Sequence, residues 1–188
     1  MGEIHPLHTP SWRMEALAAM NPRELGQAFG EDTAEWLQAA TGCGLTESQL
    51  RLGRMLLTGQ GMPVDRRAAF TCFLSASVGG SAEAQNLLGR CYENGWGVDV
   101  DRDAARLCYR QAAEKGDYRA AHNHACVLAA EGCIAGALHW FARGIGEAPE
   151  PVRQQMLQAL SGHPRCAIRA FARRELDDPL VARPGQSA

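Results

Sequence analysis

The stretch YENGWGVDVDRDAARLCYRQAAEKG, Tyr92–Gly116, decides the fold because the chain contains it twice. The earlier copy, LLTGQGMPVDRRAAFTCFLSASVGG, Leu56–Gly80, lies 36 positions upstream and aligns without a gap. The identical pairs over 49–84 and 85–120 include Gly53/Gly89, Gly59/Gly95, Gly61/Gly97, Asp65/Asp101, Ala69/Ala105, Ala76/Ala112 and Gly80/Gly116. Unrelated segments would share only about two or three identical residues. A repeat in this length range predicts a solenoid of stacked helical units.

Each repeat is predicted to contain two helices joined by a glycine-containing turn. Asp65 and Asp101 are suitable N-caps for the second helix, and Gly80 and Gly116 supply the positive φ that ends it. The segment Gly95-Trp96-Gly97 therefore connects antiparallel helices. A dinucleotide-binding loop would have to follow a strand, so this reading is rejected. The tryptophan ring is expected to fold over the adjacent helix ends.

The repeat pattern weakens towards both ends of the chain. Residues 33–40 fit the second helix of a degenerate leading unit, and residues 120–132 fit the first helix of a third unit. The third unit has a shortened turn and a second helix predicted over 137–144. The predicted domains are an N-terminal helical cap with the leading repeat over 1–44, repeats over 45–145, C-terminal capping helices over 146–176 and a flexible tail over 177–188.

The composition excludes several classes of function. The 188 residues are 46% hydrophobic and 21% charged, as in one ordinary globular domain, and a net charge of −2 predicts no nucleic-acid partner. Glu3, Arg13 and Glu15 interrupt the N-terminal segment where a signal peptide needs an apolar run, and no apolar stretch is long enough to span a membrane. The seven cysteines, an odd number, favour reduced thiols. We expect a cytoplasmic protein with no membrane partner.

The repeat consensus resembles the Sel-like repeat, a relative of the tetratricopeptide repeat. The best match lies in the second unit, at Ala84, Leu88-Gly89, Tyr92, Gly95, Gly97-Val98, Asp101, Ala105, Tyr109, Ala112-Ala113 and Gly116. The resemblance covers roughly residues 45–145 and implies an all-α, right-handed α/α solenoid of about three 36-residue helix-turn-helix repeats with helical caps. It also implies a non-catalytic adaptor that binds a protein or peptide partner on its concave face and needs no cofactor.

A groove built as in tetratricopeptide stacks would take its binding side chains from the first helices. The positions lie one before, two after and six after Ala84, and the 36-residue shift carries them to the neighbouring units. The predicted partner-binding residues are Glu47, Arg54, Glu83, Asn86, Arg90, Arg119 and His122. Arginine suits bidentate pairing with a carboxylate, so Arg54 and Arg90 are the strongest candidates. The alternative is that these side chains form only a solvated face.

A metal- or redox-responsive protein is the alternative function, and it would use His122, Cys126 and Cys133. His122 and Cys126 are four residues apart on one helical face, a spacing used for transition-metal ligands. His124 takes a core-leucine position and a complete ligand set is not identifiable, so we predict no metal.

No catalytic constellation has a characteristic spacing, so we predict no enzyme activity. We expect a monomer, with self-association through the third unit or the basic helix over 165–175 as the alternative.

Overall fold

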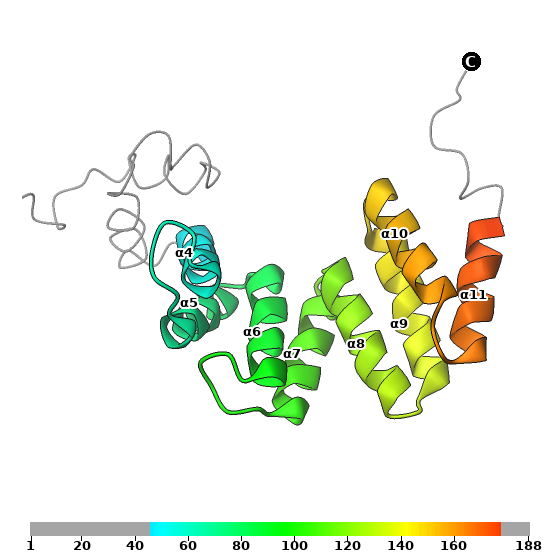
Figure 1. Ribbon diagram of the computed structural model, residues 1–188, viewed down its shortest axis with the longest axis horizontal. Helices are drawn as coiled ribbons and strands as arrows, with labels where there is room; N and C mark the ends of the chain where they lie inside the picture. Colours follow the sequence, from blue (N-terminus) through cyan, green and yellow to red (C-terminus); the bar gives the residue numbers. More distant parts are fainter. Residues whose placement is uncertain (1–45, 178–188) are drawn as a thin grey trace, which may run out of the picture. The chain divides into compact units, whose positions relative to one another are not determined.

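The computed structural model describes residues 46–177, and this part of the chain is helical throughout, without a strand (Figure 1). Its helices are α4 (Thr46–Thr58), α5 (Arg66–Val78), α6 (Ala82–Asn94), α7 (Arg102–Glu114), α8 (Tyr118–Ala130), α9 (Ile134–Glu147), α10 (Glu150–Ser161) and α11 (Cys166–Asp177). The predicted all-α class is confirmed. The predictions for the N-terminal cap and for the tail beyond Asp177 lie outside the described residues.

The chain divides into two compact units between Cys108 and Tyr109, within α7. In the first unit, α4 packs on α5 and α5 packs on α6. In the second unit, α8 packs on α9, α10 packs on α11, and both α10 and α11 contact α9. These contacts mostly join helices that follow each other in the chain, as the helix-turn-helix repeat predicts. No helix in the described part is both long and apolar enough to cross a membrane.

Each second helix buries one aromatic ring at the same place in the repeat. These rings belong to Phe73 on α5, Tyr109 on α7 and Phe141 on α9, and all three are fully buried. Tyr109 follows Phe73 by 36 positions, whereas Phe141 follows Tyr109 by 32, because the turn before α9 is shorter, as predicted. A Cβ added to Gly53 would lie 2.6 Å from the Cε1 atom of the Phe73 ring. The ring of the second helix therefore requires a small residue opposite it on α4.

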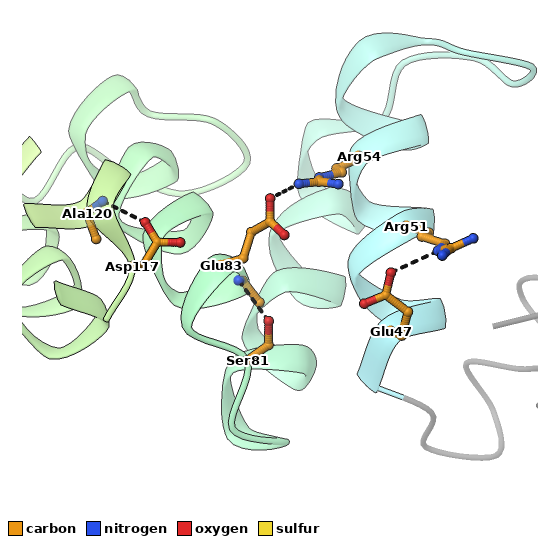
Figure 2. A network of polar contacts seen from close by, with 8 residues as sticks. Glu47, Arg51, Arg54, Ser81, Glu83, Asp117 and Ala120 are labelled. Atoms are coloured by element: carbon orange, nitrogen blue, oxygen red, sulfur yellow. Dashed lines mark hydrogen bonds and ion pairs between the residues drawn. The ribbon is translucent and has the colours of Figure 1, made fainter. Parts of the chain in front are cut away.

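Side-chain caps begin four of the helices. In each case a side-chain oxygen accepts a hydrogen bond from the backbone N–H three residues later, which satisfies one of the donors left unpaired at a helix start. The Asp117 bond and the Ser81 bond are drawn in Figure 2. The pairs are Asp65 with Ala68 at 2.9 Å, Ser81 with Ala84 at 3.1 Å, Asp101 with Ala104 at 2.9 Å and Asp117 with Ala120 at 2.7 Å.

The positive φ angles of Gly80 (93°) and Gly116 (92°) confirm the predicted helix stops. The second unit also uses arginine side chains at helix ends. Arg143 donates Nη2 to the carbonyl of Glu114, the last residue of α7, at 3.2 Å. Arg153 donates to the carbonyl of Ile145 near the end of α9 at 3.1 Å. These guanidinium groups supply donors to carbonyls that lack an intrahelical partner.

Helix α9 is longer than the predicted 137–144 segment at both ends and contains three glycines. Gly146 lies inside this helix, beyond the predicted end of the segment. Gly144 shows why glycine is accepted here: an added Cβ would lie 3.0 Å from the Tyr118 carbonyl oxygen and 3.1 Å from the Ala121 Cβ. Close packing of α9 on α8 therefore needs glycine at this position, and packing overrides its low helix propensity.

Candidate partner-binding face

The first helices of the first unit expose a narrow charged stripe, which we call the first-helix face: Glu47 and Arg54 on α4, Glu83 and Arg90 on α6. The opposite sides of these helices are buried at Ser48, Leu50, Leu52, Gly53 and Met55 on α4 and at Ala84, Asn86, Leu88, Gly89 and Cys91 on α6. The small residue of each first helix is Ser48 on α4 and Ala84 on α6. The side chains one position before it and six positions after it are therefore exposed or half-buried.

An ion pair crosses the first-helix face between α4 and α6. Nη2 of Arg54 contacts Oε1 of Glu83, and the two side chains stay 46% and 33% exposed (Figure 2). On α4, Nε of Arg51 donates to Oε1 of Glu47 at 2.9 Å. Pairs this open to solvent contribute only about 0–1 kcal/mol each. Their main effect is to fix where positive and negative charge lies on the face.

Arg90 is held differently from Arg54, although both occupy the same repeat position. Its guanidinium carbon Cζ lies 5.1 Å from the centroid of the Trp96 ring, and its guanidinium forms no ion pair among the described residues. The ring is partly buried against the core of the first unit, as expected for a ring folded over helix ends. The sequence offered no signal that Trp96 would lie under Arg90, since Gln60 takes its place in the first repeat.

The structure corrects the predicted outward placement of Asn86, and it leaves His122 half-buried. Asn86 is 3% exposed, and so is Leu50 at the equivalent position of α4. In the second unit the His122 ring lies 5.3 Å from the Phe141 ring, and its Nδ1 is buried without a hydrogen-bond partner in residues 46–177. Burial lowers the pKa of the His122 imidazole. A helix packed on two sides leaves only a narrow stripe exposed, so the position two after the small residue turns inward.

Arg119 is exposed on α8 of the second unit, as predicted. Its guanidinium carbon lies 4.6 Å from the centroid of the Tyr118 ring. Like Arg90, it is held by an aromatic ring and forms no ion pair among the described residues. Each of the two units thus contains at least one exposed arginine that lies over an aromatic ring.

The residues of the alternative metal site do not form one cluster. Within residues 46–177 no group of three or more His, Cys, Asp or Glu side chains is arranged to hold a metal ion. Cys126 and Cys133 are exposed, whereas the His122 ring packs on Phe141. Cys91 and Cys108 are free thiols in the core, and burial raises the pKa of the Cys91 thiol to about 11. A thiol that is rarely ionised reacts slowly with oxidants and metals.

Comparison with known families finds the Sel1 repeat at residues 46–80 and 82–117. Two solved structures show the same fold. The Sel1 repeat protein from Oxalobacter formigenes has a TM-score of 0.65 and 22% identity, covering 81% of this chain and 65% of its own. The Escherichia coli protein c5321, described as a protective antigen of uropathogenic strains displaying an SLR fold, has a TM-score of 0.70 and 21% identity, covering 88% of this chain and 37% of its own.

The chain thus spans about two thirds and about one third of the lengths of these two proteins. At these identities the likeness concerns the fold, and no match was found among curated proteins. The family match stops at residue 117, so the shortened third unit is seen only in the structure, at α8 and α9. This chain thus contains two Sel1 repeats, and its all-helical architecture has the fold of solved Sel1 repeat proteins, a helical solenoid related to the tetratricopeptide repeats.

Proposed function

We propose that this protein is a non-catalytic adaptor and that the first-helix face binds a segment of a partner protein. Sel1 repeats generally serve as scaffolds for protein–protein interaction. Helical-repeat proteins bind through extended surfaces to which successive repeats contribute equivalent side chains. In the first unit these equivalent side chains are Glu47 with Glu83 and Arg54 with Arg90.

One observation carries the proposal: the face presents charged groups that the fold does not need for packing. The core side of α4 and α6 is filled by apolar and small residues, while Arg54 and Arg90 lie outside it. Exposed arginines are enriched where proteins bind each other, because one side chain combines charge, donors and a flat apolar surface. In the second unit, Arg119 is exposed at the repeat position of Glu47 and Glu83.

Affinity capture from a lysate of the source cells tests this function. The bait proteins are the wild type, the Arg54→Glu/Arg90→Glu variant and a matched Arg66→Glu/Arg102→Glu variant. Arg66 and Arg102 are also repeat-equivalent and exposed, but they lie at the starts of α5 and α7. We expect a partner that the wild type and the matched variant retain and that the first-helix variant loses.

A charge swap separates binding from folding. Arg54→Glu combined with Glu83→Arg keeps an ion pair between α4 and α6 while it reverses both charges on the face. The swapped protein should melt like the wild type and still lose the partner. Equal capture by all variants would mean that the partner binds another surface. Capture of no partner by any bait would contradict an adaptor role.

The remaining expectations concern the protein in the cell. We propose that it acts as a monomer in the cytoplasm and binds neither nucleic acid nor membranes. Light scattering over a range of concentrations tests the monomer, and self-association would appear as a mass that rises with concentration. Fractionation of source cells tests the location.

A further inference from the structure

Among the described residues, Arg90 has no acidic partner, whereas its repeat-equivalent Arg54 has one. Arg54 pairs with Glu83, which follows it by 29 residues. In the sequence, the residue that follows Arg90 by 29 positions is Arg119, an arginine and not an acid. Glu93, one turn further along α6, forms no ion pair with Arg90. The donors of the Arg90 guanidinium are therefore not committed to any carboxylate in residues 46–177.

The ring under Arg90 belongs to a turn that is fixed in place. Trp96 lies between Gly95 and Gly97, whose φ angles are 69° and 76°. Gly97 lies so close to the start of α5 that an added Cβ would come 2.1 Å from the carbonyl oxygen of Arg66. The turn is thus held against the preceding repeat. A guanidinium stacked on a fixed ring loses less conformational freedom when it binds, which favours affinity.

We infer, resting on the proposed function, that Arg90 and Trp96 form a carboxylate-recognition site that selects partner segments carrying an Asp or Glu side chain. The guanidinium carbon lies over the ring, 5.1 Å from its centroid, and the N–H groups at the edge of the guanidinium can donate two parallel hydrogen bonds to one carboxylate. The exposed position on α6 admits an extended segment, and the positive charge, which has no counter-ion within residues 46–177, is complementary to an acidic one. Arg54 is already paired with Glu83 and is not part of this site.

Selection from a library of random peptides of about twelve residues tests the inference without knowledge of the natural partner. The immobilised proteins are the wild type, Arg90→Gln, Arg90→Lys and the control Arg102→Gln, which removes the same charge from an exposed position at the start of α7. All four are first shown to be folded by their melting curves. The wild type and Arg102→Gln should enrich peptides with Asp or Glu at a recurring position.

The enriched peptides then give a quantitative test. Binding to Arg90→Gln should be weaker by about tenfold or more, since a charge-assisted bidentate contact is lost. Arg90→Lys should also bind less tightly, because a lysine keeps the charge but neither the fork nor the stacking. Replacing the recurring acid by its amide should weaken binding to the wild type and change little for Arg90→Gln.

The outcomes separate this inference from the proposed function. Enriched peptides without an acidic position, or acidic peptides that bind Arg90→Gln as well as the wild type, overturn the carboxylate site and leave the adaptor role standing. Peptides that need their free C-terminus and no acidic side chain overturn the choice of an Asp or Glu side chain. A wild type that enriches no peptide at all contradicts the proposed binding of a partner segment.

Discussion

Gly61 and Gly97 occupy the same position in successive repeats and have nearly the same backbone angle, φ 75° and 76°. Their surroundings differ. A Cβ on Gly97 would meet backbone atoms of Arg66 and Arg67 at 2.1–2.7 Å, whereas the nearest atom to a Cβ on Gly61 would be Cε of Met55 at 3.6 Å. The turn of the second repeat therefore rests on the start of α5. The positive φ favours glycine at both positions, and at Gly97 the close approach of α5 also requires it.

We predict that Gly97→Ala destabilises the protein more than Gly61→Ala. Both variants place an alanine at positive φ, which costs about 1–2 kcal/mol. Gly97→Ala adds an overlap with backbone atoms that cannot move aside, and overpacking typically costs a further 1–3 kcal/mol or so. Urea unfolding of the two variants and the wild type measures the difference. Equal losses for the two alanines would show that the turn does not rest on α5.

His122 makes the stability of the second unit depend on pH. Burial lowers the pKa of its imidazole below the ordinary 6.5, so the unfolded chain binds a proton more readily than the folded one. The stability that the neutral ring contributes is therefore fully present above pH 6.5, and it is lost as the pH falls through the pKa of the ring in the folded protein. We predict that the melting midpoint of the wild type, relative to that of His122→Leu, decreases as the pH is lowered from about 7.5 to about 5, the range in which histidine titrates. A constant difference across this range would contradict the burial of the ring.

The cysteines are predicted to fall into two reactivity classes. Cys126, Cys133 and Cys166 are exposed, whereas Cys91 is fully buried with its thiol pKa raised to about 11. Iodoacetamide should modify the exposed thiols of the native protein, and Cys91 only after unfolding. Mass spectrometry of tryptic peptides reads this directly. Rapid native modification of Cys91 would mean that α6 opens easily.

At the scale of the element, most helices could be predicted because their ends are encoded locally. Aspartate caps and glycine stops are short-range signals, and they agree with the observed starts of α5 and α7 and with the ends of α5 and α7. The extent of α9 could not be predicted in this way. Its glycines are accepted because α8 packs closely at Gly144, a contact that no local pattern contains.

The capping hydrogen bonds allow a prediction about single elements. Asp101→Ala removes the side-chain acceptor for the Ala104 N–H at the start of α7 and should cost about 1 kcal/mol. Asp99→Ala removes the same charge two residues earlier, from an exposed position in the same turn, and should change stability by less than about 0.5 kcal/mol. Thermal unfolding followed by circular dichroism compares them. Similar costs for the two variants would mean that charge, and not capping, stabilises α7.

At the scale of the whole molecule, the repeat length predicted the fold class, and the repeat register predicted the exposed arginines of the first-helix face. The register could not predict that Asn86 is buried and His122 half-buried, because their burial depends on the neighbours packed against a first helix. Nor could it predict the pairing of Arg54 with Glu83 or the stacking of Arg90 on Trp96. These contacts join side chains that differ between repeats, so a consensus does not contain them.

The most direct test of partner binding on the first-helix face is site-specific photo-cross-linking in the source cells. A photoreactive phenylalanine derivative replaces, one at a time, Glu47 and Glu93 on the first helices and Thr71 and Leu107 on the second helices, all of them exposed. Illumination should attach a partner protein at Glu47 and Glu93 and leave Thr71 and Leu107 without an adduct. Adducts confined to the second-helix positions, or the absence of any adduct from properly folded protein, would contradict binding at this face.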